Sequence, residues 1–129
     1  MDKRELCADI VRRMISAGAS DLHIAPGQCI QMRVDGILVP EQCIPDSDAV
    51  DALLERILSA EQRAALCTRD IDFAWTYAGR RFRVNAYRMQ GGAGLALRLL
   101  PARIPTPVDI GMPQVLQMTA ARRDGLALV

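Results

Sequence analysis

Two spacings of apolar residues alternate along this chain, and together they predict helices and strands in one mixed fold. In the segment 45–58, apolar residues recur at the i, i+3, i+4 spacing of an amphipathic helix: Val50, Leu53, Leu54, Ile57 and Leu58. Helical spacing and capping residues predict further helices over residues 3–17, 59–66 and 114–121.

Shorter segments alternate apolar with polar residues, which is typical of half-buried strands. Six strands are predicted, at Ser20–Ile24, Ile30–Val34, Ile37–Pro40, Asp70–Tyr77, Arg80–Met89 and Leu95–Leu100. Asp35-Gly36 and Ala78-Gly79 predict tight turns between neighbouring strands, the first of them a type I′ hairpin. We therefore predict an α+β fold, in which helices cover one face of a mostly antiparallel sheet.

Arginines gather in the segment 79–98, which contains no acidic residue. Arg81 and Arg83 alternate with Phe82 and Val84, so one face of this strand is predicted to be cationic and the other to join the core. Arginines converging on one sheet face repel one another until an anion or an acidic partner arrives. The alternative is a solvated face, or one paired in salt bridges with another domain.

A turn at Gly91-Gly92 would bring the next strand back beside the arginine strand. In that register Asn85 lies opposite Arg98. The side chain of Arg98 would then share the face of Arg81 and Arg83, and the three arginines are our candidate site residues.

Composition limits what such a face can bind. The 129 residues suit one domain, and a formal net charge of only +1 argues against a general coating of polyanions. The chain has four cysteines without a CxxC pair and a single histidine, so no metal site is predicted. No apolar run resembles a secretory signal or a membrane span, so we expect a cytosolic protein with reduced thiols, although a disulfide is allowed by count.

Asp21 and His23 alternate with apolar residues in the first predicted strand. They could form an acid–base pair. We favour a simpler role, hydrogen bonding to a nearby loop, because no nucleophile or second ligand lies near them in the sequence.

Three prolines follow the last predicted strand, at Pro101, Pro105 and Pro107, and predict an extended and fairly stiff linker. The apolar residues 126–129 resemble the first part of a buried strand with nothing after it. We therefore expect that the polypeptide is a fragment that stops inside an element of a following domain.

Several short motifs resemble, in their order, the PilT-like ATPases, the retraction motors of type IV pili that are related to type II and type IV secretion ATPases. The motifs are ASDLHI from Ala19, RVDG from Arg33, FRVNAY from Phe82, GGAG followed by LRLLP, IPTP from Ile104 and GLALV at the end. The resemblance implies a PAS-like N-terminal domain over residues 1–100. Residues 101–129 would then be an interdomain linker, a short helix and the start of the first strand of a RecA-like ATPase domain, whose Walker A motif GxxxxGK[ST] and Walker B motif this sequence lacks.

The resemblance also implies partners and cofactors. In such homohexamers the N-terminal domain packs against an ATPase domain, and neighbouring subunits are the expected partners, so Arg81, Arg83 and Arg98 would approach the phosphates of ATP. ATP and Mg are expected only for the full-length protein, and this chain alone is expected to bind no cofactor or metal, to hold no catalytic residue and to be inactive. The full-length protein would be cytoplasmic, peripheral to the inner membrane, and would act with the machinery at the pilus base without inserting into the membrane.

Two other functions fit the pattern less well. A free-standing PAS-like sensor or adaptor would need a ligand-binding group in its core, and His23 and the cysteines do not converge in the sequence. A nucleic-acid-binding module would need aromatic residues among the arginines, whereas Phe82 lies on the opposite face and only Tyr87 shares the cationic one, so nucleic acid is not an expected partner.

Overall fold

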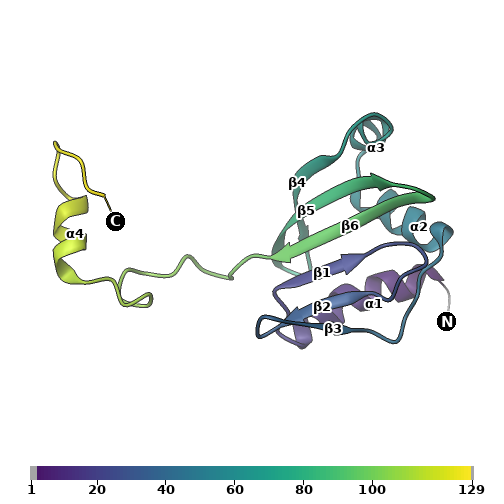
Figure 1. Cartoon of the computed structure of the whole chain (residues 1–129), viewed down its shortest axis with the longest axis horizontal. Helices are drawn as coiled ribbons and strands as arrows, with labels where there is room; N and C mark the ends of the chain where they lie inside the picture. Colours follow the sequence, from purple (N-terminus) through teal and green to yellow (C-terminus); the bar gives the residue numbers. More distant parts are fainter. Residues whose placement is uncertain (1–2, 129) are drawn as a thin grey trace.

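One six-stranded antiparallel sheet carries the first three helices on a single face, and the fourth helix lies apart from it (Figure 1). The computed structural model describes residues 3–128, and only the backbone for residues 3–8. The strands lie in the order β3-β2-β1-β6-β5-β4. Their bounds are β1 Asp21–Ile24, β2 Gln31–Val34, β3 Ile37–Pro40, β4 Ile71–Tyr77, β5 Arg80–Met89 and β6 Gly92–Leu99. The helices are α1 Lys3–Ser16, α2 Ser47–Ile57, α3 Ala60–Leu66 and α4 Gln114–Ala120.

The core lies between the sheet and the first three helices. Helix α1 packs on β1 and α2, α2 packs on β6, and α3 packs on β4 and β5. Alternate residues of β5, namely Phe82, Val84 and Ala86, are fully buried on this side, as period-two alternation requires. The predicted α+β fold, with helices on one face, is thus confirmed, and the other face of the sheet is left open.

Local sequence explains where α2 and α3 begin. The side chain of Asp46 accepts a hydrogen bond from the backbone N–H of Ala49 at 3.0 Å, which caps α2. Ser59 and Gln62 form the predicted capping box of α3, each side chain bonded to the backbone of the other residue.

Two of the predicted turns have the geometry that their residues favour. Asp35 and Gly36 have φ angles of +48° and +83°, and Ala78 and Gly79 have +49° and +70°. Positive φ at both central residues is typical of a type I′ turn, whose twist matches that of the strands it joins. In both hairpins the residues that flank the turn are directly paired.

The predicted turn at Gly91-Gly92 is wrong by one residue. Met89 pairs with Gly92, so the turn is Gln90-Gly91, with Gly91 at a φ of +91°. The hydroxyl of Ser47 donates a hydrogen bond to the carbonyl oxygen of Gly91 at 3.2 Å and ties this turn to α2. Moving the turn by one residue moves the pairing by two.

The corrected register places Arg98 opposite Arg83 instead of Asn85. Because side chains alternate with period two, a slip of two residues keeps Arg98 on the predicted face. The register error therefore made the predicted neighbour of Arg98 wrong, whereas the predicted face of its side chain is correct.

Beyond Leu100 the chain extends away from the sheet to α4 (Figure 1). The carboxylate of Asp109 accepts hydrogen bonds from the Arg103 guanidinium and from the backbone and hydroxyl of Thr106, and these bonds lower the pKa of Asp109 to about 2. Residues 126–128 form no strand and are exposed, and Val129 lies outside the described residues. The expectation that they begin a strand of another domain stays a prediction.

Neighbouring residues on opposite faces of β5 should respond very differently to truncation. Phe82→Ala removes a ring that is 0% exposed, and should lower the free energy of unfolding by about 3–5 kcal/mol. Arg83→Ala, on the open face, should change it by less than about 0.5 kcal/mol. Urea unfolding of both variants tests the assignment of the faces, and losses of similar size would contradict it.

Candidate functional site: the arginine face of the sheet

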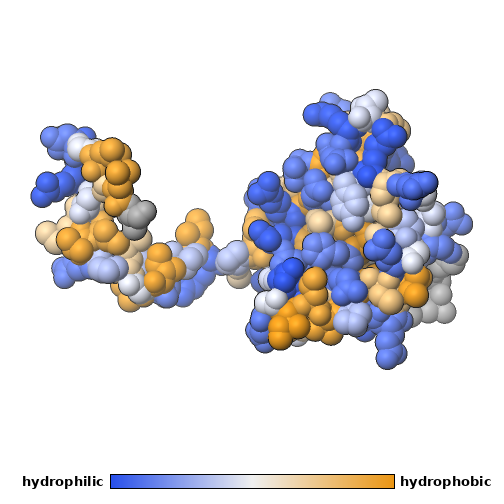
Figure 2. All heavy atoms as spheres, in the orientation of Figure 1, coloured by the Kyte–Doolittle hydropathy of each residue, from blue (hydrophilic) through white to orange (hydrophobic). Residues whose placement is uncertain are grey.

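A shallow depression of about 190 Å³ lies on the open face of the sheet. The residues that line it come from four strands: Asp21, His23, Asp72, Arg83, Asn85, Ala96, Leu97 and Arg98. Ala96 lies between His23 of β1 and Asn85 of β5 in the strand pairing, so a small side chain stands between two larger ones. This difference in side-chain size accounts for the depression. Hydrophilic residues predominate over this part of the molecule in Figure 2.

Arg83 and Arg98 are directly paired across β5 and β6, and they stand at the edge of this depression. Their side chains are 70% and 68% exposed. Like charges directly opposite each other destabilise a sheet, so this arrangement has an electrostatic cost that an anion would relieve. The pair is the strongest feature of the open face that points to a ligand.

Carboxylates on both sides offset part of this repulsion. In the strand register one row of residues crosses four strands, in the order Arg33, Asp21, Arg98 and Arg83. The Nε of Arg98 donates to Oδ1 of Asp21 at 2.8 Å, and the Nε of Arg33 lies 3.6 Å from Oδ2. Asp72 lies 4.0 Å from the Nε of Arg83. The row keeps an excess of positive charge even with Asp72 included.

Asp21 is the one buried charged residue within the part of the chain whose side chains are described, and it is 8% exposed. Burial alone would raise the pKa of this carboxyl group. The Ser20 hydroxyl, which donates at 2.7 Å, and the guanidinium groups of Arg98 and Arg33 outweigh burial, so the pKa falls below its ordinary value of 3.8. Asp21 is therefore ionised at neutral pH.

The three predicted arginines do not form one cluster. Arg83 and Arg98 are neighbours, whereas Arg81 lies two positions along β5, opposite Thr76. The exposed side chain of Arg81 makes no hydrogen bond or ion pair with the residues that the structure describes. It shares the face and could reach a ligand that extends along the strand.

Asp21 and His23 line the same depression but are not arranged as an acid–base pair, because Asp21 is engaged by the two arginines and Ser20. The simpler role that we favoured, bonding to a loop, also misses the true partner. Arg98 is 77 residues away in sequence and was not connected with Asp21 from the sequence alone. This contact could have been predicted only by first predicting that β1 pairs with β6.

Aromatic side chains lie mainly on the helix-covered side. Trp75 stacks on Tyr77 with ring centroids 5.1 Å apart and lies 5.5 Å from Phe82. On the arginine face, the ring of Tyr87 lies against Gly94, where an added Cβ would come within 2.5 Å of it. Base-stacking platforms interleaved with arginines, which a nucleic-acid-binding surface would use, are not present among the described residues of this face.

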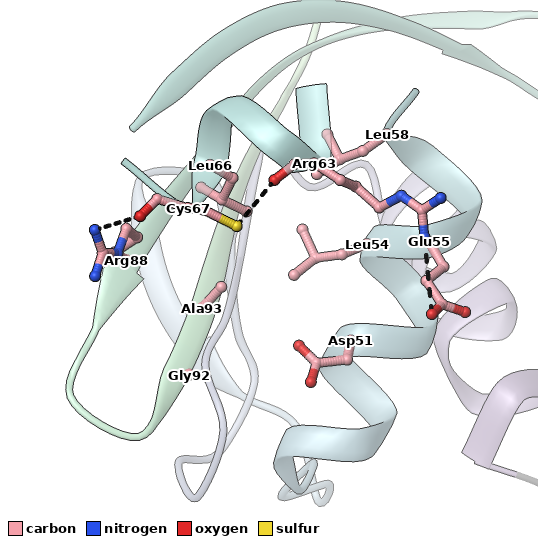
Figure 3. A pocket seen from close by; sticks show the side chains of 10 residues that line it. All are labelled: Asp51, Leu54, Glu55, Leu58, Arg63, Leu66, Cys67, Arg88, Gly92 and Ala93. Atoms are coloured by element: carbon pink, nitrogen blue, oxygen red, sulfur yellow. Dashed lines mark hydrogen bonds and ion pairs between the residues drawn. The ribbon is translucent and has the colours of Figure 1, made fainter. Parts of the chain in front are cut away.

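A second pocket, of about 370 Å³, opens at the surface between α2, α3 and the β5–β6 hairpin (Figure 3). Leu54, Leu58 and Leu66 line it, and charged side chains stand around them. Arg88 is turned toward α3, where its Nη1 donates to the carbonyl oxygen of Cys67 at 2.7 Å. These three leucines belong to the edge of the core, and of the histidine and cysteines whose side chains are described only Cys67, which is exposed, lines the pocket. The pocket therefore does not bring together the groups that a PAS-like sensor would use to hold a ligand.

The remaining candidate ligands are dispersed. Cys29, Cys43 and Cys67 are free thiols, and the side chain of Cys7 lies outside the described residues. Within the described part of the chain, His, Cys, Asp and Glu residues form no group of three or more that could hold a metal ion. No helix among the same residues has the length and apolar character needed to cross a membrane.

The ionised state of Asp21 predicts the sign of a pH effect. Because its pKa is lower in the folded chain than in the unfolded chain, its contribution to stability is present above pH 3.8 and is lost as pH falls below that value. Asp21→Asn should therefore be less stable than wild type at neutral pH, and the difference should shrink in acid. Urea unfolding of both proteins from about pH 6 to about pH 3 measures it. A difference that stays constant across this range would contradict the ion pairing.

Over its whole length the chain is similar in sequence to one group of ATPases. It is 34% identical to the type IV pilus retraction ATPase PilT of Pseudomonas aeruginosa, over 100% of this chain and 37% of that protein. The chain spans between 32% and 37% of the length of the curated relatives it matches. No protein-family model matches the sequence.

Solved structures agree with the sequence comparison. The crystal structure of the pilus retraction motor PilT with bound ADP matches with a TM-score of 0.77 and 29% identity, covering 88% of this chain and 34% of that one. The ATPase DotB of Legionella pneumophila matches with a TM-score of 0.69, covering 95% of this chain and 36% of that one, and at 22% identity it supports the fold alone.

Proposed function

Because the chain is homologous to the N-terminal domain of the PilT-like ATPases, we propose that it serves as that domain in a hexameric ATPase that powers type IV pilus retraction. In this proposal the arginine face packs against an ATPase domain and supplies Arg83 and Arg98, with Arg81 beside them, toward the phosphates of ATP. The pairing of Arg83 with Arg98 on the open face is the observation that carries it.

The electrostatics of the face favour a phosphate ligand. Two guanidinium groups on adjacent strands offer planar donors to the oxygens of one polyphosphate, and binding would relieve their repulsion. A nucleotide held by a neighbouring ATPase domain supplies a high negative charge at a fixed place. Arginines that reach such a nucleotide from another domain stabilise charge that develops during phosphoryl transfer.

We assign residues 1–100 to the N-terminal domain and residues 101–129 to the linker, a short helix and the first part of a RecA-like ATPase domain. The exposed apolar residues of the second segment support this division, because they would gain a cover in that domain: Ile104, Val108, Ile110, Val115, Met118, Leu126 and Leu128. ATP and Mg would bind in the ATPase domain. The partners would be the neighbouring subunits of a homohexamer and the inner-membrane machinery at the pilus base, on its cytoplasmic side.

The arginine pair should bind a polyphosphate measurably in the chain itself. Inorganic triphosphate at low ionic strength should shift the side-chain NMR signals of Arg83 and Arg98 in a saturable way, and Arg83→Ala or Arg98→Ala should weaken this binding about tenfold, the scale of one charge-assisted hydrogen bond. Arg88→Ala is the matched control, since Arg88 belongs to the same strand but bonds to Cys67 on the helix side.

An affinity for triphosphate that falls equally in all three variants would indicate general charge attraction, and would contradict a specific role for the pair. Absence of saturable shifts at Arg83 and Arg98 in the wild-type chain would contradict phosphate binding by this face.

The proposal predicts that the chain alone binds phosphate groups but does not hydrolyse ATP. The sequence contains no Walker A motif, GxxxxGK[ST], so we expect the chain to show no turnover of Mg·ATP in a coupled assay of phosphate release. The coding sequence beyond Val129 is expected to supply that motif within about ten codons, since the loop directly follows a strand in P-loop proteins. Robust turnover by the chain alone would contradict the assignment.

A further inference from the structure

We propose that Asp21 is a positioning residue for Arg98, which it holds in the orientation that receives an anion. The use of that orientation for phosphate rests on the proposed function, whereas the positioning itself rests on the contacts around Asp21. Each of the two carboxylate oxygens of Asp21 contacts different partners.

The carboxylate of Asp21 is fixed from several directions. Its Oδ2 accepts a hydrogen bond from the Ser20 hydroxyl at 2.7 Å and faces the Nε of Arg33 at 3.6 Å. Its Oδ1 accepts from the Nε of Arg98 at 2.8 Å. Strand pairing places Arg33 and Arg98 on opposite sides of Asp21, so the backbone of three strands holds the arrangement. A carboxylate held in this way gives Arg98 one preferred orientation.

Arg98 uses only one edge of its guanidinium group for this bond. Its two terminal amino groups make no hydrogen bond with the described residues, and 68% of the side chain is exposed. The Nε edge is therefore held against the sheet while the other donors remain available. Lysine has no second edge and could not serve both purposes.

The neighbour of Arg98 is held much less firmly. Arg83 lies 4.0 Å from Asp72, whose side chain is 59% exposed, compared with 11% for Asp21. Repulsion from Arg83 would push a free Arg98 away from the pair, because the two are directly opposite. Asp21 opposes this displacement. Because it already orders the Arg98 side chain, less side-chain entropy is lost when an anion binds.

Removing the charge of Asp21 distinguishes positioning from simple neutralisation. Asp21→Asn makes the face more positive. If Asp21 acted only as a countercharge, the variant would therefore bind triphosphate more tightly than the wild-type chain does. If Asp21 positions Arg98, the variant should bind triphosphate roughly two- to tenfold more weakly, in spite of the added positive charge. Asp72→Asn is the matched control, because it removes the other carboxylate of the depression without releasing Arg98.

A double-mutant cycle tests whether Asp21 acts through Arg98. Arg98→Lys keeps the charge but loses the Nε donor, so Asp21→Asn should no longer weaken triphosphate binding in that background. A loss of the same size in both backgrounds would overturn the proposal, as would tighter or unchanged binding by Asp21→Asn alone.

The order of the Arg98 side chain is measured without any anion. ¹⁵N relaxation at Nε of the wild-type chain should show a rigid Arg98, and Asp21→Asn should make it mobile while leaving the backbone spectrum intact. A mobile Arg98 in the wild type would overturn positioning whether or not triphosphate binds. A rigid Arg98 without triphosphate binding would instead identify the proposed function as the part that fails.

Discussion

Antiparallel pairing of β1 with β6 is the constraint on which the site depends. It places the last strand of the sheet in its middle, between β1 and β5, and thereby joins the two three-stranded halves of the sheet, β1–β3 and β4–β6. The same pairing brings Asp21 beside Arg98, although 77 residues separate them in sequence. On the opposite face of these strands Leu22 and Leu97 are buried in the core. Packing on one face thus fixes the register that creates the charged row on the other.

The charged row combines an unfavourable and a favourable contact in adjacent positions. Arg83 faces Arg98 across one strand boundary, and Asp21 faces Arg98 across the next. Because Asp21 is buried and bonded to Ser20, the favourable contact is the more rigid of the two. The exposed donors of the arginine pair are left for a ligand, and the fold assembles this surface without a helix to cover it.

Much of this arrangement could be predicted from local sequence. The alternation in residues 80–89 correctly predicts the two faces of β5. The residue pair Asp35-Gly36 correctly predicts a type I′ turn, since both residues have positive φ angles in the structure. The turn before β6 was misplaced, because three glycines lie within residues 91–94 and any of several could occupy a left-handed position. The contact of Asp21 with Arg98 depends on strand order, and neither residue carries a local signal of it. The division between the domain and the following segment, and the role of the arginines, stay predictions.

The most direct measurement of the central claim is a structure of the assembled ATPase that contains this chain, with an ATP analogue bound. The account predicts guanidinium nitrogens of Arg83 and Arg98 at about 2.7–3.2 Å from phosphate oxygens of a nucleotide held by an ATPase domain. It also predicts that the Nε of Arg98 remains bonded to Asp21. An arginine face that is turned to solvent, or that contacts only protein carboxylates while the nucleotide lies elsewhere, would contradict it.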